Sequence, residues 1–152
     1  MGNIVEKAKK FAEERHAGQF RRDGVTPYFR HLLRVVNLSQ QNRQIIMCGY
    51  EREDRYEILM AVAYLHDIIE DGKATRDELE EMFGVTVAQY VKLLTHNPKK
   101  DYFEYIRKIK SFGYGVEIIK LADILDNLSD SPTEKQVKKY SKALKIFLGF
   151  EE

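Results

Sequence analysis

Apolar residues recur at helical spacing along most of the sequence. The first such segment, from about Ile4 to Ala17, places its apolar side chains on one face, and Gly18 follows it as a candidate C-cap. Further segments predict helices over residues 27–38, 56–71, 75–84, 86–95, 100–112, 116–129 and 133–148. No segment shows sustained strand alternation, so the pattern predicts an all-α fold: one domain over residues 1–152, built as a bundle of about eight helices.

Local signals predict where several of these helices begin and end. Pro27 opens the second helix after a loop over residues 19–26. Thr75 is expected to N-cap the fourth helix in a capping box with Glu78. The polar stretch over residues 40–55 contains a short apolar piece, 45–47, that is expected to pack on the body of the protein. The last helix is expected to turn one apolar face inward, formed by Val137, Tyr140, Leu144 and Phe147.

Composition narrows the classes of function. The 152 residues are 43% hydrophobic, which suits one core, and 25 Lys and Arg nearly cancel 24 Asp and Glu. Bulk charge therefore gives no reason to expect a nucleic-acid or membrane partner. Cys48 is the only cysteine, which excludes an internal disulfide and a cysteine-based zinc site and fits the reducing cytoplasm. No apolar run typical of a signal peptide opens the sequence, so a cytoplasmic location is expected; the oligomeric state is left open, with a homodimer as the candidate.

Ionisable residues are concentrated near the end of a segment that is otherwise apolar on nearly all sides. His66, Asp67, Glu70 and Asp71 follow the apolar run over residues 59–65. If the helix continues through them, all four side chains fall within one arc of about 140°. Such a helix is buried, and buried charges must be paired or bind a metal ion. Three carboxylates and one imidazole on one arc therefore indicate a bound cation.

Two further groups could complete such a site. Asp123 lies in a largely apolar helical segment with Asn127 one turn later, and His31 lies near the start of the second helix. A lone buried histidine is more often a satisfied core residue, and a lone helical aspartate is more often a cap. Because His31 and Asp123 occur together with the His66-Asp67 pair, we interpret both as metal ligands. His16 and His96 are interpreted as structural.

The order His … His-Asp … Asp of these residues resembles the signature of the HD superfamily of phosphohydrolases. The sequence is most similar to the hydrolase domain of the RelA/SpoT family, especially its small stand-alone members. Five segments carry the resemblance, together with a final Tyr140: 16–24, 27–31, 65–71, 75–84 and 119–127.

The resemblance implies removal of the 3′-pyrophosphate from guanosine 3′,5′-bis(diphosphate), an alarmone, to give GDP and pyrophosphate. The metal ligands that it implies are His31, His66, Asp67 and Asp123. The residues that it implies for positioning and activating water are Glu70 and Asp71. The residues that it implies near the nucleotide substrate are Arg21, Arg22, Asn127 and Tyr140. A site of two imidazoles and two carboxylates favours Mn2+, or another divalent transition metal, over Mg2+.

The sequence also departs from the family pattern. The interval from His31 to His66 is longer than usual, with the extra residues around 41–52, and the interval from Asp67 to Asp123 is shorter. No synthetase domain is present, so alarmone synthesis is not expected. The alternatives are an HD phosphohydrolase of another nucleotide, such as a deoxynucleotide or NADPH phosphatase, and a non-catalytic nucleotide-binding regulatory module. A two-metal cyclic-dinucleotide phosphodiesterase normally needs further histidines, and only His96 lies in that interval.

Overall fold

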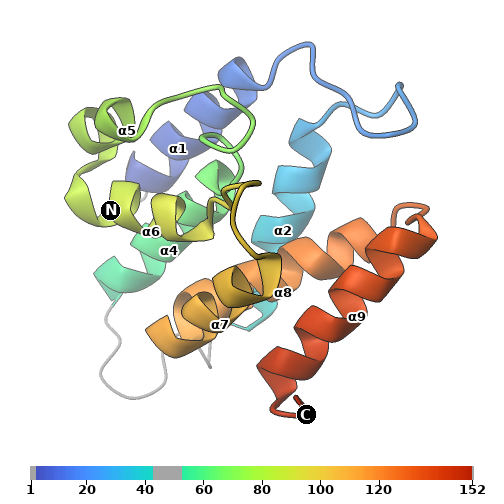
Figure 1. Ribbon diagram of the computed structural model, residues 1–152. Helices are drawn as coiled ribbons and strands as arrows, with labels where there is room; N and C mark the ends of the chain where they lie inside the picture. Colours follow the sequence, from blue (N-terminus) through green and yellow to red (C-terminus); the bar gives the residue numbers. More distant parts are fainter. Residues whose placement is uncertain (1–2, 43–52, 152) are drawn as a thin grey trace.

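The computed structural model describes residues 3–42 and 53–151, and this part of the chain forms eight α-helices (Figure 1). In chain order they are α1 (Asn3–Arg15), α2 (Phe29–Gln41), α4 (Glu53–Leu65), α5 (Arg76–Phe83), α6 (Val85–Leu94), α7 (Tyr102–Phe112), α8 (Tyr114–Leu128) and α9 (Glu134–Leu148). The all-α prediction is confirmed. None of these described helices is both long enough and apolar enough to cross a membrane. The apolar piece over residues 45–47 lies outside the described residues.

Helix α4 is the centre of the core. Every side chain from Leu59 to Leu65 is buried, which is expected of a helix that is apolar on all sides. It packs against α1, α2 and α6, and also contacts α8. A Cβ at Gly115 of α8 would lie 2.7 Å from Leu59 Cδ1, so the glycine allows α8 to approach α4 closely. Helix α2 in turn packs on both α4 and α8, which brings three helices of the predicted site together.

The chain leaves the α-helix before the His-Asp pair. Helix α4 ends at Leu65 and residues 66–72 form turns, so the prediction of a continuous helix to residue 71 is wrong. The physical reason is a C-terminal closure: Lys73 N donates to Ile68 O at 2.8 Å, and Gly72 adopts a φ of 69° that a side chain would disfavour. The ionisable residues therefore project from a turn instead of from one helical arc.

The start of α5 carries half of the predicted capping box. Thr75 Oγ1 accepts a hydrogen bond from Glu78 N at 3.2 Å, so the N-cap is confirmed. The Glu78 side chain does not return to the cap, because it forms an ion pair with Arg15 at the end of α1. This ion pair links α5 to α1.

Helix α9 has one exception to its predicted inner face. Tyr140 and Phe147 are buried as expected, and Leu144 is partly buried. Val137 is 42% exposed, so its assignment to the inner face is wrong. It lies in the first turn of α9, at the solvent edge of a buried face that continues through Ala143.

The loop between α1 and α2 folds as a short hairpin. Arg21 N donates to Thr26 O at 2.8 Å and Tyr28 N donates to Gln19 O at 2.8 Å. Pro27 belongs to this hairpin, so α2 begins two residues later than predicted, at Phe29. Hydrogen bonds from the hairpin arginines tie it to the end of α8 and place it beside the predicted site.

Candidate metal centre and active site

Four side chains from three parts of the fold converge on one point. His31 comes from α2, His66 and Asp67 from the turn after α4, and Asp123 from the middle of α8. All four are buried, and one potential ligand atom from each lies within 4.8 Å of the others. The structure thus brings together the four residues that the sequence predicted as metal ligands. We call them the metal cluster.

The nitrogen and oxygen atoms of the metal cluster lie close together, but the histidine Nε2 atoms form no hydrogen bonds with the carboxylates. His31 Nε2 lies 3.2 Å from Asp123 Oδ1 and 3.3 Å from Asp67 Oδ2. His66 Nε2 lies 3.1 Å from Asp67 Oδ2 and 3.5 Å from Asp123 Oδ1. Neither Nε2 atom has a partner with hydrogen-bond geometry among the described residues. Buried polar atoms are rarely left unpaired, so two orphaned nitrogens facing two carboxylate oxygens fit a bound metal ion.

Each imidazole is oriented through its other nitrogen. His31 Nδ1 lies 2.6 Å from Asp126 Oδ2, and His66 Nδ1 lies 2.8 Å from Ala63 O. Hydrogen bonds of this kind fix the ring and leave Nε2 free to ligate, as in carboxylate–histidine–metal arrangements. Sequence reasoning missed Asp126. Its signal was a third acidic residue on the apolar α8 segment, three positions after Asp123.

Neighbouring groups also hold the two carboxylates. The Tyr28 hydroxyl donates to Asp67 Oδ2 at 2.5 Å. Lys120 Nζ donates to Asp123 Oδ2 at 2.7 Å, and Asn127 Nδ2 donates to Asp123 Oδ1 at 2.9 Å. The oxygens that face the histidines are therefore fixed in position.

Electrostatics favour a cation at the centre of the cluster. Burial lowers the pKa of His31, but the carboxylates of Asp123, Asp126 and Asp67 outweigh burial and raise that pKa to about 9. Burial raises the pKa of Asp123, but Lys120 and the two histidines hold it well below its usual range. The carboxylates therefore favour positive charge at the imidazoles. A divalent cation at the centre of the cluster would supply that charge.

Glu70 and Asp71 lie at the rim of the metal cluster. A Glu70 oxygen accepts a hydrogen bond from the backbone N of His96 at 2.7 Å. Asp71 Oδ2 accepts one from Gln19 Nε2 at 3.0 Å, and its side chain is 25% exposed. Desolvation, with the charge of Asp67 adding to it, raises the pKa of Asp71. Gln19 is in turn held by His16, whose Nδ1 lies 2.8 Å from Gln19 Oε1.

The two hairpin arginines have different surroundings. Arg21 is buried, and its guanidinium donates to Asp130 at 2.9 Å and to Asn127 at 3.0 Å. Arg22 is exposed and donates to the backbone carbonyls of Asn127 and Asp130 at the end of α8. Arg21 therefore braces Asn127 inside the protein, whereas Arg22 lies at the surface. Tyr140 is buried on α9.

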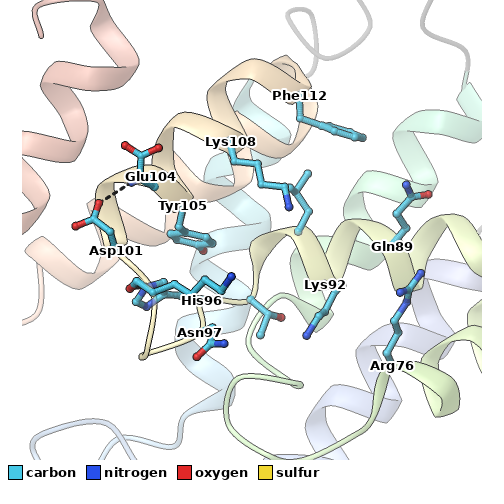
Figure 2. A pocket seen from close by; sticks show the side chains of 13 residues that line it. Arg76, Gln89, Lys92, His96, Asn97, Asp101, Glu104, Tyr105, Lys108 and Phe112 are labelled. Carbon is cyan, nitrogen blue, oxygen red and sulfur yellow. Dashed lines mark hydrogen bonds between the residues drawn. The ribbon is translucent and has the colours of Figure 1, made fainter.

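A groove of about 770 Å³ lies next to this site, between α6 and α7 (Figure 2). Figure 2 shows His96 and Tyr105 among its labelled side chains, together with basic residues such as Lys92 and Lys108. Its lining includes no residue of the metal cluster, and His96 connects the two regions through its bond to Glu70. The His96 ring is engaged locally, with Nε2 2.9 Å from Lys100 O, which agrees with its structural interpretation.

Comparisons with known proteins agree with this geometry. Residues 8–151 match the HD domain family. The guanosine-3′,5′-bis(diphosphate) 3′-pyrophosphohydrolase of Spiroplasma citri is 32% identical over 139 residues, which cover 82% of this chain and 16% of that protein. The guanosine-3′,5′-bis(diphosphate) 3′-pyrophosphohydrolase MESH1 of Danio rerio is 33% identical over 125 residues, covering 79% of this chain and 64% of that protein. The GTP pyrophosphokinase rsh of Brucella abortus is 33% identical over 135 residues, 82% of this chain and 16% of that protein.

A solved structure shares the fold. It is that of a metazoan orthologue of SpoT, described as hydrolysing ppGpp and playing a role in starvation responses. The TM-score is 0.72 at 25% sequence identity, over 97% of this chain and 84% of that one. The helical fold and the buried cluster of two histidines and two aspartates define an all-α protein with an HD-type metal centre. The chain belongs to the HD domain family, with homology to the SpoT/Rsh proteins and MESH1.

Proposed function

We propose that this chain is a metal-dependent phosphohydrolase that removes the 3′-pyrophosphate of guanosine 3′,5′-bis(diphosphate) and releases GDP and pyrophosphate. The observation that carries the proposal is the buried metal cluster, whose two Nε2 atoms have no hydrogen-bond partner among the described residues, with Glu70 and Asp71 at its rim. The activities named for the Spiroplasma and Danio relatives support the choice of substrate. The chain spans only 16% of the first of these and 64% of the second.

The metal cluster would hold one divalent cation. Two imidazole nitrogens and two carboxylate oxygens suit Mn2+ or another divalent transition metal, and we propose Mn2+. When bound, the cation lowers the pKa of a coordinated water and neutralises charge that develops on phosphorus. The lone cysteine, Cys48, and the nucleotide substrate fit a cytoplasmic enzyme. We propose that residues 1–152 form a single domain.

The rim carboxylates would supply the base. Asp71 is half-buried and has a raised pKa, so it is suited to take a proton from the attacking water. Glu70, anchored by His96 N, would orient that water. The water oxygen bonds to the phosphorus that is attached to the 3′ oxygen, and the bond between that phosphorus and the 3′ oxygen breaks. The 3′ oxygen takes up a proton and leaves as the hydroxyl of GDP, and the other product is pyrophosphate.

The predicted substrate contacts divide into two kinds. We propose that Arg22 and Tyr140 face the substrate, since Arg22 is exposed and its guanidinium suits phosphate oxygens or stacking on the base. Arg21 and Asn127 are joined to each other by a hydrogen bond, and Asn127 also donates to Asp123. Their contribution is then to fix Asp123 and the hairpin, and we propose that the nucleoside lies beside Asn127.

Product analysis with defined metal content tests the proposal. Metal-stripped protein is incubated with guanosine 3′,5′-bis(diphosphate), with and without Mn2+, and GDP and pyrophosphate are measured. We expect release of both in equal amounts only with Mn2+. No release from protein whose Mn2+ content has been verified would reject this substrate. Parallel assays with deoxynucleotides and NADPH then identify a phosphohydrolase of another nucleotide, and binding without turnover of any of them identifies a regulatory module.

A further inference from the structure

A lysine that holds Asp123 lies against the metal cluster and has further donors without an assigned acceptor. The side chain of Lys120 on α8 is 11% exposed, and its Nζ lies 2.7 Å from Asp123 Oδ2. An ammonium group has three N–H donors, and Asp123 occupies one of them. On its other side Nζ lies 5.4 Å from the centre of the Tyr105 ring and 6.0 Å from that of Tyr102. The remaining donors thus lie between the metal cluster and α7.

A second donor in the same place has no partner. The Tyr102 hydroxyl is buried and forms no hydrogen bond with any described residue. A buried hydroxyl without a partner is unfavourable, so this one is available to donate to an oxygen of a bound ligand. The Tyr102 ring lies near the metal cluster, because its centre is 6.0 Å from Lys120 Nζ, which donates to Asp123.

A second ammonium group completes the cluster of donors. Lys139 on α9 lies with Nζ 4.7 Å from the Tyr102 ring centre and 4.7 Å from that of Tyr140. It is partly buried and makes no ion pair within 4 Å in the described parts of the chain. Lys120 and Lys139 both approach the Tyr102 ring, with Nζ 6.0 Å and 4.7 Å from its centre. Burial, followed by the charge of Lys120, lowers the pKa of Lys139.

We propose that Lys120, Lys139 and Tyr102 form an anion subsite that receives the terminal phosphate of a pyrophosphoryl group, while the phosphate under attack lies at the metal cluster. Lys120 donates a hydrogen bond to Asp123, a residue of the metal cluster, so the subsite and the metal cluster are adjacent. Only a group with two adjacent anionic centres can occupy both. A diphosphate has that form and a monophosphate does not. This inference rests on the proposed function and assigns the part of the site that holds the pyrophosphate leaving with the products.

The test compares inorganic pyrophosphate with inorganic orthophosphate as probes. Calorimetric titrations use protein with stoichiometric Mn2+, so that free metal does not complex the probe. The variants are Tyr102→Phe and Lys139→Met, which do not touch a metal ligand. The matched controls are Tyr114→Phe, 73% exposed, and Lys138→Met, 77% exposed and paired with Glu134. We expect each test variant to weaken pyrophosphate binding about tenfold, as loss of a hydrogen bond to a charged group does, and to leave orthophosphate and Mn2+ binding unchanged.

The outcomes separate this inference from the proposed function. Equal loss of both probes, or no loss of pyrophosphate binding in variants with unchanged circular dichroism, would overturn the subsite. Selective loss of pyrophosphate binding supports it, even if the wild-type protein does not cleave guanosine 3′,5′-bis(diphosphate). In that case the proposed substrate is wrong, and the subsite serves the diphosphate group of another one. Hydrolysis that proceeds normally in both test variants would leave the proposed function intact and count against the subsite.

Discussion

The metal cluster has two walls that are built in different ways. The helix wall is part of α8, where Lys120, Asp123 and Asn127 lie three and four residues apart and bond to one another within a single helix. The turn wall is the segment 66–72, in which no helical ladder fixes the side chains. The helix wall is thus positioned by local geometry, which any well-packed α8 preserves.

The turn wall depends on contacts from distant parts of the chain. Its three acidic side chains receive hydrogen bonds from the Tyr28 hydroxyl, the Gln19 amide and the backbone of His96. Two of these partners belong to the hairpin before α2, and the third borders the groove of Figure 2. Placing acid and base groups on such a turn allows their orientation to be adjusted by loops that do not disturb Asp123, the proposed metal ligand on α8.

Removing one carboxylate from each wall should give the largest effects. We expect Asp67→Asn and Asp123→Asn both to lose Mn2+ and to lower hydrolysis on the order of 10³-fold, because the charge stabilisation by the cation is lost. Asp123→Asn should also lower the stability of the metal-free protein more, since it leaves the buried Lys120 ammonium without its carboxylate partner. Metal analysis, activity and urea unfolding measure these effects. Equal stability of the two variants would show that Lys120 finds another partner.

Changing the rim acids should separate chemistry from metal binding. We expect Glu70→Gln and Asp71→Asn to retain Mn2+, and loss of the general base to lower kcat by about 10²–10⁴-fold. The base works deprotonated and burial raises the pKa of Asp71, so activity should fall as the pH drops through a value above the ordinary aspartate range. The variant that lacks the base should lose this acidic limb of the pH profile. If both variants keep the limb, a different group accepts the proton.

The carboxylate behind His31 should have an intermediate effect. Asp126→Asn keeps the shape but weakens the hydrogen bond that orients the imidazole, so we expect Mn2+ to bind about 10–100-fold more weakly. At saturating Mn2+ most of the activity should return. Asp77→Asn, on the exposed face of α5, serves as the control. Unchanged metal affinity would mean that packing alone orients His31.

The sequence predicted the helix wall better than the turn wall. Asp123 and Asn127 are four residues apart on α8, so they lie on one face of the helix and form the hydrogen bond that this spacing allows. The predicted arc through residues 66–71 assumed that the helix continues to residue 71, whereas α4 ends at Leu65. The resemblance to HD proteins implied His66 and Asp67 as ligands independently of that arc, and both side chains lie in the cluster.

Contacts between distant elements were not accessible from the sequence. Asp126 acquires its role only because α2 packs on α8 and brings His31 Nδ1 to 2.6 Å. The family resemblance implied Arg21 as a substrate contact, yet the hairpin turns it inward to Asp130 and Asn127. Periodicity predicts which face of a helix is buried, but the partner across the interface depends on the packing of the whole bundle.

The smallest predicted effect tests the turn wall most specifically. Gln19→Ala removes the amide that donates to Asp71 and leaves the metal cluster untouched. Loss of one such hydrogen bond should lower kcat about 2–10-fold. The same hydrogen bond favours the charged carboxylate and lowers its pKa against the effect of burial, so its removal should move the acidic limb of the pH profile to higher pH.

A control variant and the direction of the pH shift decide what this result means. Gln89→Ala, exposed on α6, should change neither kcat nor the limb. A shift to higher pH in Gln19→Ala alone identifies Asp71 as the titrating base and the hairpin as the element that tunes it. A fall in kcat with an unmoved limb would assign proton transfer to Glu70, which the hairpin does not contact through any described hydrogen bond. The tuning of the turn wall would then come from His96 and the loop that precedes α7.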